Sequence, residues 1–340
     1  MNINFLKYYF FIILIILSKV SLSQDIHFSQ FFNNQANINP ALVGDYRGNW
    51  CFVNNYRRQW DAVTTPFITN SIAFDKQFFV KKERFNIGFN FLTDKSGEVS
   101  YYTNNFNLNL SYHKTFKYNI INFGFQTAYI SKGFSLHSIT FPDQYDNIGG
   151  TFSKEISTNE ILFNNNLSYF DFSAGILYRA FNRTINPSIG FAAFHLTSPN
   201  ESFFNEGQYK LPIRKVVNSK IECIISKKST LIADILYMSH EKASNIVYGA
   251  RYFYDISKDN NKIIKPFLGV YARNGLNSNF DATIFLIGVK TNFYEIALNY
   301  DYNISDLEDV SYHFGAIEIS FIYRGIYTFL NTNLSPCERF

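Results

Sequence analysis

Cysteine, tryptophan and proline are scarce in this chain of 340 residues, which has three Cys, two Trp and eight Pro. The cysteines, Cys51, Cys223 and Cys337, show no CxxC spacing, and this argues against a metal site built from them. An odd number of cysteines in an oxidising compartment leaves at least one thiol unpaired. Cys51 and Cys223 fall inside expected strands, where simple packing is the preferred interpretation.

Long apolar runs are absent beyond the N-terminus, so no segment reaches the roughly 18 apolar residues of a membrane-spanning helix. The N-terminus itself is basic through Lys7, and Tyr8 to Leu17 is an unbroken apolar run. Ser21 and Ser23 then offer small residues at both cleavage positions. The pattern predicts a signal peptide over residues 1–23 and export; an uncleaved membrane anchor is the alternative.

Charge is sparse and nearly balanced, with 31 Lys and Arg against 27 Asp and Glu and a formal net charge of +4. Removal of residues 1–23 takes away Lys7 and Lys19 and no acid, which leaves +2. This small excess is not the footprint of a nucleic-acid-binding protein, so no nucleic-acid partner is expected.

Catalytic and cofactor motifs are also missing. The chain has no G-x-S-x-G, no H-E-x-x-H, no phosphate loop and no G-x-G-x-x-G, so we expect no enzyme, no cofactor and no metal. A hydrolase that assembles Ser, His and Asn from neighbouring strands remains an alternative. The acidic stretch 301–309 lacks the glycine and final glutamate of an EF-hand loop and is interpreted as a solvated loop. The histidines are scattered singly: His27, His113, His137, His195, His240 and His313.

What the chain has in abundance is alternation and aromatic residues. Phe106 to Tyr112 alternates strictly between apolar and polar residues, and similar segments recur about fourteen times. Period two over about 10 residues suits a strand with one face on lipid and one on a wet lumen. The 38 Phe and 24 Tyr suit a lipid-facing band with interfacial girdles. The sequence therefore predicts an all-β fold, a transmembrane antiparallel β-barrel of the outer membrane with about 14 strands.

The strands can be placed from the alternation and the turn residues. No Pro/Gly/Ser-rich linker divides the chain, and this disfavours the alternative of two soluble β-domains. The expected strands are 48–60, 67–79, 85–93, 101–116, 121–134, 169–181, 187–196, 213–226, 230–240, 244–255, 265–273, 281–291, 294–303 and 312–324.

The connections alternate between short and long, as barrels require. The two longest, 135–168 and 197–212, fall in one set, whereas 256–264 and 241–243 break the parity and leave room for a misplaced strand. The expected organisation is a signal peptide (1–23), a periplasmic or lumenal segment (24–47), the barrel (48–324) and a periplasmic C-terminal tail (325–340).

Charge follows the same parity. The opposite loops are acidic, whereas the short connections predict a basic inner face that docks something acidic in the periplasm. The plain alternative is that polar loops carry charge in any case. The basic residues of the short set are Lys81, Lys82, Arg84, Lys117, Arg183, Lys227, Lys228, Lys258 and Lys262.

Several ordered motifs carry a family resemblance. They are Gln24-Asp25-Ile26-His27-Phe28-Ser29-Gln30-Phe31, Asn39-Pro40-Ala41-Leu42-Val43-Gly44, Tyr56-Arg57-Arg58-Gln59-Trp60, Leu92-Thr93-Asp94-Lys95-Ser96-Gly97, Phe141-Pro142-Asp143-Gln144-Tyr145-Asp146, and His195-Leu196-Thr197-Ser198-Pro199-Asn200-Glu201-Ser202-Phe203 with Leu211-Pro212. Together they closely resemble the PorP/SprF family of type IX secretion membrane proteins. The C-terminus departs from the family's Cys-Pro-Arg-Phe, because Glu338 stands where the proline would be.

The resemblance implies an accessory barrel of type IX secretion in Bacteroidota, with a link to gliding motility and no chemistry of its own. It implies periplasmic secretion-system or peptidoglycan-binding partners and a secreted surface protein, whose export or surface attachment the barrel supports. A passive porin or hydrophobic-solute transporter is the rival function. The residues selected for partner binding are Lys81, Lys82, Arg84, Lys227, Lys228, Asp143, Gln144, His195, Pro199 and Asn200. A purely structural role stays open for the motif residues, with positive φ at Gly44 and Gly97 and a rigid loop entry at Pro199.

Overall fold

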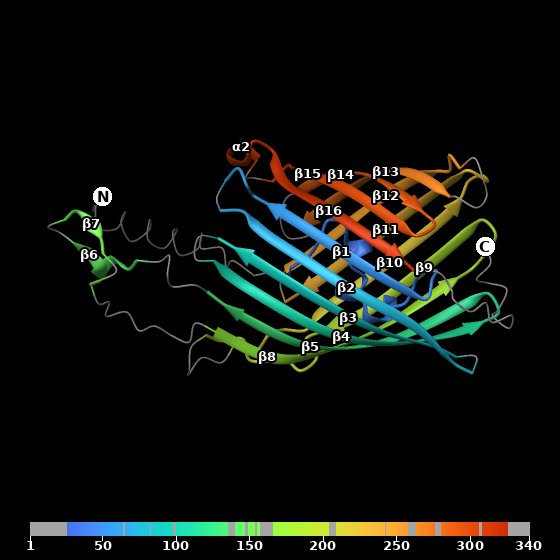
Figure 1. The fold of residues 1–340 in the computed structure, drawn as a ribbon, viewed down its shortest axis with the longest axis horizontal. Helices are drawn as coiled ribbons and strands as arrows, with labels where there is room; N and C mark the ends of the chain where they lie inside the picture. The colour runs from blue at the N-terminus through green and yellow to red at the C-terminus, as the bar shows by residue number, and fades with distance from the viewer. Residues whose placement is uncertain are drawn as a thin grey trace, which may run out of the picture.

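The computed structural model of the chain describes residues 26–325 with short gaps, and most of these residues form one barrel (Figure 1). The expected signal peptide, most of the expected C-terminal tail, and the residues Lys82, Lys258, Lys262 and Cys337 lie outside the described residues. The gaps are 64, 82, 98–99, 135–139, 147–148, 154, 157–165, 204–208, 242, 258–262, 276–279 and 306–307.

Fourteen antiparallel strands, counted over the described residues, close into the barrel, and β1 pairs with β16 to complete it. This confirms the predicted fold class. All fourteen predicted strands are present, with ends that differ by at most three residues. They are β1 (Trp50–Gln59), β2 (Phe67–Val80), β3 (Glu83–Ser96), β4 (Tyr101–Phe116), β5 (Asn119–Gly133), β8 (Asn166–Ala180), β9 (Ile185–Phe194), β10 (Arg214–Ile224), β11 (Ser229–His240), β12 (Ala243–Tyr254), β13 (Ile264–Gly275), β14 (Phe280–Thr291), β15 (Tyr294–Asn303) and β16 (Phe314–Arg324).

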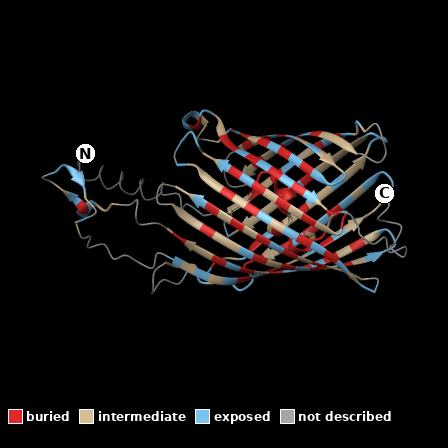
Figure 2. Cartoon of the chain, viewed as in Figure 1, coloured by how far each residue is buried: buried red, intermediate tan, exposed pale blue. Residues whose placement is uncertain are grey.

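Alternation along each strand separates lumen from lipid, as the bands of buried and exposed residues in Figure 2 show. In β15, Glu295 and Asn299 are buried in the lumen, whereas Ile296 and Leu298 are exposed on the outer face. Strands of 10 to 16 residues are long enough to cross a bilayer when tilted, which takes about 9–11 residues. Because the barrel is closed, every strand edge is paired and no backbone group needs water in the hydrocarbon region.

The two ends of the barrel differ in their connections. One end, here called the turn end, carries 81–82, 117–118, 181–184, 225–228, 255–263 and 292–293. The other, the loop end, carries 134–165 and 195–213, and the former includes a separate hairpin of β6 (Tyr145–Asp146) and β7 (Thr151–Phe152). The short connection 241–242 lies at the loop end and the longer 255–263 at the turn end, so the broken parity reflects real loop lengths and not a misplaced strand.

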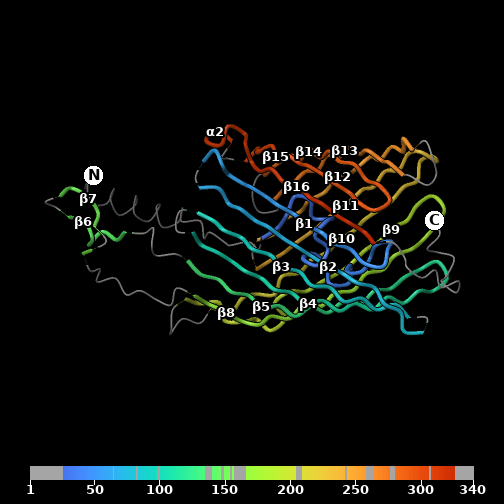
Figure 3. Tube along the Cα trace, in the orientation of Figure 1, coloured from blue at the N-terminus to red at the C-terminus, as the bar shows by residue number. Residues whose placement is uncertain are grey.

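The lumen is filled by residues 26–49, here called the plug, whose trace runs inside the barrel in Figure 3. Three short 3-10 helices shape it: η1 (Phe31–Asn33), η2 (Gln35–Asn37) and η3 (Pro40–Leu42). The plug runs from the loop end, where His27 lines a cavity, to the turn end, where Asn49 donates to the Gly325 carbonyl at 3.1 Å. The sequence left a periplasmic and a lumenal position open for this segment; the described part lies in the lumen.

The plug contacts the lumen wall through both apolar and polar side chains. On β9 to β15, apolar side chains face inward and pack on Phe31 and Ile38 of the plug. On β2 to β5 and β16, serine, asparagine and glutamine side chains hydrogen-bond the plug. Barrel lumens are ordinarily polar and wet. Apolar side chains in the lumen are therefore explained by the plug, which covers them permanently. These side chains are Ala192, Phe194, Val216, Leu236, Val247, Phe253, Phe267, Tyr271, Ile284, Leu286 and Ala297.

Candidate functional site

Two buried carboxylates on β15 and β16 hold the start of the plug. Glu318 accepts hydrogen bonds from the backbone N–H groups of Ser29, at 2.6 Å, and Gln30, at 2.9 Å. The Ser29 hydroxyl donates to Asp301 at 2.6 Å. Both carboxylates have an exposed fraction of 0%. Such buried charges require partners, because an unpaired ion in an interior costs several kcal/mol.

Two arginines supply those partners. Arg57 on β1 forms an ion pair with Glu318, and its guanidinium lies 3.5 Å from Asp301. Arg273 on β13 lies 3.1 Å from Asp301 and donates to the Ser29 hydroxyl at 3.0 Å. Arg273 also forms an ion pair with Asp281, so the cluster joins two arginines to three carboxylates. Ser29 therefore receives hydrogen-bond partners from β1 on one side of the β1–β16 seam and from β13, β15 and β16 on the other.

The motif Asn39 to Gly44 forms the middle of the plug. Asn39 caps η3 by accepting from the Ala41 N–H at 2.9 Å, and its amide donates to Asn218 on β10 at 3.1 Å. On the opposite side η3 lies against Gly124 of β5, where an added Cβ would stand 2.1 Å from the Ala41 nitrogen. A side chain at position 124 would therefore displace the plug. The motif that carries the family resemblance thus fixes the plug in the lumen.

The end of the plug is held by ions at the turn end. Gly44 has φ +80°, a conformation that favours glycine, and its carbonyl accepts from the Gln77 amide at 2.9 Å. Asp45 forms a bidentate ion pair with Arg179 on β8. Burial alone would raise the pKa of Asp45, but Arg179 and Lys220 outweigh it and lower the pKa to about 2. Asp45 is therefore ionised at neutral pH and ties the plug to the wall.

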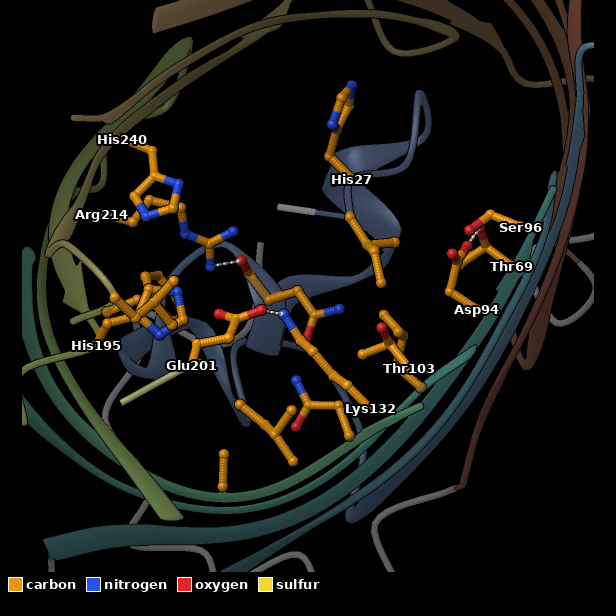
Figure 4. Close-up of a pocket in the computed structure, with 18 of the residues that line it drawn as sticks. His27, Thr69, Asp94, Ser96, Thr103, Lys132, His195, Glu201, Arg214 and His240 are labelled. Atoms are coloured by element: carbon orange, nitrogen blue, oxygen red, sulfur yellow. Dashed lines mark hydrogen bonds and ion pairs between the residues drawn. The ribbon is translucent and has the colours of Figure 1, made fainter. Parts of the chain in front are cut away.

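Above the plug, the lumen opens at the loop end into a cavity of about 560 Å³, here called the vestibule (Figure 4). Its lining combines ion pairs, amides, histidines and aromatic rings from most strands. Lys132 forms an ion pair with Glu201, and the Thr69 hydroxyl donates to Asp94 at 2.6 Å. Arg214 donates to the Asn37 carbonyl of the plug at 3.3 Å. The plug is therefore the floor of the vestibule, whose volume falls within the range of small-ligand sites.

Three of the predicted partner-binding residues lie at this end, in the connection after β9. His195 has φ +61° and its Nδ1 atom lies 2.8 Å from Asp171, so it is part of the vestibule wall. Pro199 accepts from the Leu211 N–H at 2.9 Å, and Asn200 accepts from the Tyr209 N–H at 2.9 Å. The contacts described for Pro199 and Asn200 close this loop on itself.

Asp143 and Gln144 lie in the long connection 134–165, within the 3-10 helix η5 (Pro142–Gln144). Gln144 is buried; its side chain accepts from the Phe141 N–H at 3.0 Å and donates to the Ile156 carbonyl at 2.8 Å. The side chain of Gln144 therefore organises this loop. Asp143 is exposed beside it.

The remaining predicted residues belong to the turn end. Lys81, Lys227 and Lys228 are exposed there. Residues that the prediction did not select for partner binding join them: Arg47 from the plug is exposed at the same end, as are Lys117 and Arg183 in turns. Of the acids at this end, Glu83 and Asp255 form ion pairs with Lys114 and Lys265. We call the exposed set Arg47, Lys81, Lys117, Arg183, Lys227 and Lys228 the basic turn face.

The prediction that placed Arg84 in a turn is wrong. The strand β3 begins at Glu83, two residues earlier than expected, so alternation directs Arg84 into the lumen. There its Nε atom donates to the Nδ1 atom of His113 at 2.9 Å. Arg84 is therefore no part of the basic turn face.

The charge cluster around Ser29 was missed by sequence reasoning. Asp301 was assigned to a solvated acidic loop, but it is buried in β15 and bound to Arg273. A usable signal existed, because Asp301 and Glu318 each occupy a lumen position in an alternating strand. The two arginines of the motif Tyr56 to Trp60 lie on different faces: Arg57 faces the lumen, and Arg58 is exposed and paired with Asp61.

Other candidate chemistry can be located within the described part of the chain. Across residues 26–325, with the gaps left out, no group of three or more His, Cys, Asp and Glu residues is placed to hold a metal ion. Cys51, which is buried, and Cys223 are free thiols. No helix among the described residues has the length and apolar character needed to span a bilayer.

Fold and plug together define an outer-membrane β-barrel with a filled lumen. The chain belongs to the family described as type IX secretion system membrane protein PorP/SprF, which matches residues 20–323. It is therefore a barrel associated with type IX secretion and located in the outer membrane. No curated protein matches the chain.

Similar solved structures are also outer-membrane proteins. The CymD monoaromatic hydrocarbon channel has 8% identity and a TM-score of 0.49, with 87% of this chain and 94% of that chain covered. The toluene transporter TbuX of Ralstonia pickettii has 9% identity and a TM-score of 0.48, covering 85% and 92%. The KdgM porin has 9% identity and a TM-score of 0.39, covering 80% and 98%.

Proposed function

We propose that this barrel is a non-catalytic accessory of type IX secretion that supports export or surface attachment of a secreted protein. The observation that supports this most is the anchored plug. Hydrogen bonds to Glu318 and Asp301 hold its start, the Asp45–Arg179 ion pair holds its end and amide contacts hold its middle, so the described lumen is packed and not an open pore. A passive porin or hydrophobic-solute transporter needs a passage, which makes it the weaker alternative.

The two ends then take different partners. We infer that the turn end faces the periplasm, together with the tail 325–340, after removal of the signal peptide 1–23. The basic turn face docks an acidic periplasmic component of the secretion system or of a peptidoglycan-binding assembly. Attraction between exposed charges guides association and weakens with salt, because the screening length falls from about 10 Å at 0.1 M to 3 Å at 1 M.

Charge removal at each end tests the docking surface. The variant Lys81→Ser/Lys227→Ser/Lys228→Ser should lose most of the periplasmic protein that co-purifies with the tagged wild type at low salt. The barrel should stay folded, because exposed substitutions usually change stability by within about 0.5 kcal/mol.

The matched control removes three exposed lysines at the loop end, Lys95→Ser/Lys210→Ser/Lys215→Ser. Co-purification from native outer membranes at 50 mM and 500 mM salt provides the measurement. Equal partner recovery with both triple variants would show that the basic turn face is not the docking surface.

A further inference from the structure

The vestibule contains amide groups with no protein partner, and this points to a ligand. Asn107 on β4 is 4% exposed, and neither its amide oxygen nor its amide nitrogen has a hydrogen-bond partner among the described residues. Asn245 on β12 is 6% exposed, and its amide oxygen is equally without a partner. Both side chains line the vestibule, and so does Asn105, whose amide oxygen also lacks a partner.

Unpaired buried amides are costly. A buried donor or acceptor without a hydrogen bond loses about 1–3 kcal/mol of solvation, which explains why most such groups in proteins are paired. In the vestibule these amides lie on opposite walls, on β4 and on β12, and border one continuous cavity. A molecule that offers both donors and acceptors along its length would satisfy them together.

The charged and apolar side chains of the vestibule indicate which class of molecule would bind there. Charges of both signs face the cavity, with Lys132 and Arg214 on one hand and Asp94 and Glu201 on the other. Apolar side chains border it as well, namely Leu92, Ala128, Ile130, Phe194 and Leu211. A polypeptide has backbone amides, apolar side chains and charges of both signs, so an extended segment can engage all three kinds of lining group together.

We propose that the vestibule binds an extended segment of a polypeptide, with Asn107 and Asn245 hydrogen-bonded to its backbone amides. This inference rests on the proposed role in handling a secreted protein and assigns that role a site. The plug forms the floor, so the segment enters from the loop end and does not pass through the barrel.

Peptide display tests the proposal on the purified full-length barrel. A phage library of random linear dodecapeptides is selected on the wild-type protein in lipid nanodiscs, and the enriched peptides are synthesised with a fluorophore. Fluorescence polarisation should show saturable binding that weakens at least tenfold in Asn107→Ala/Asn245→Ala. These substitutions remove unpaired amides, so the barrel should stay folded. The check is the heat-modifiable gel shift, the change in gel mobility between unheated and heated samples of a folded barrel, which should be retained.

The matched control is Asn55→Ala. Asn55 is also lumenal, 1% exposed and without partners for its amide atoms, but it does not line the vestibule. Peptide affinity should be unchanged in this variant. An equal loss in the control and in the double variant would overturn the site, as would the absence of any enriched peptide.

Two competing occupants are included in the same assay. Maltohexaose and chitohexaose are titrated as displacing ligands, and saturable saccharide binding without peptide binding would overturn the proposal. Peptides that bind only a variant lacking Gln24 and Asp25 would assign the vestibule to the chain's own N-terminal segment and would also overturn it. If peptide binding fails while gene deletion still blocks surface display of a secreted protein, only this inference falls and the proposed function stands.

Discussion

An ion pair inside this barrel connects the plug to the wall, between Asp45 of the plug and Arg179 on β8. Because Arg179 and Lys220 outweigh burial, the pKa of Asp45 falls from an ordinary 3.8 to about 2 in the folded protein. A lowered pKa means that the stabilisation is fully present above the ordinary value and is lost as pH falls through about 2. This difference corresponds to roughly 2–3 kcal/mol at neutral pH.

Replacement of this carboxylate should therefore remove an acid-sensitive contribution. We expect Asp45→Asn to lower the midpoint of thermal unfolding at pH 7 and to flatten its dependence on pH between 4 and 2. The measurement is the temperature of the heat-modifiable gel shift at each pH, with the exposed Asp143→Asn as control. A wild-type-like pH profile in Asp45→Asn would contradict the assignment of this ion pair as an anchor.

At the scale of elements, the close packing of the plug on the barrel wall depends on a glycine. The backbone of η3 approaches β5 so closely that Gly124 has no room for a Cβ. Overpacking of this kind typically costs about 1–3 kcal/mol, which the structure can relieve by moving the plug away from the strand. Gly124→Ala should therefore loosen the plug while the strand, which is paired on both sides, stays in register.

Planar-bilayer conductance and proteolysis measure that loosening. The wild-type barrel should be silent, and Gly124→Ala should show discrete openings together with faster proteolytic cleavage within residues 26–49. Thr127→Ala, on the outer face of the same strand, should behave as wild type. Steady conductance of the wild-type barrel would be incompatible with a fixed plug.

Strands were predictable from sequence, whereas the plug was not. Ile296 and Leu298 alternate with Ala297 and Asn299, and such alternation indicates a strand with lipid on one side. It can be recognised within a short stretch of sequence. The start of β3 was predicted two residues too late, and Arg84, which pairs with His113 on the neighbouring strand β4, was therefore assigned to a turn.

The plug depends instead on distant contacts. Ser29 binds Glu318, 289 residues away, and no periodicity in either segment predicts that pairing. The short 3-10 helices of the plug have no amphipathic period to recognise. The asparagine-rich motif around Asn39 was visible in the sequence, but its role as a cap and wall contact required the structure.

At the scale of the whole molecule, both ends have distinct surfaces, and the proposed function requires a fixed orientation. In a background without native cysteines, Lys210→Cys at the loop end should react with a membrane-impermeant maleimide on intact cells. Lys227→Cys at the turn end should react only after the outer membrane is permeabilised. Labelling in the reverse order would invert the topology and place the basic turn face outside.

The most direct test of the account is deletion of the gene, followed by surface proteomics and a permeability assay on the same cells. We expect loss of a specific secreted protein from the surface, unchanged uptake of a small fluorescent solute, and restoration by the wild-type gene. A normal set of surface proteins together with reduced solute uptake would contradict the account and identify the barrel as a transporter.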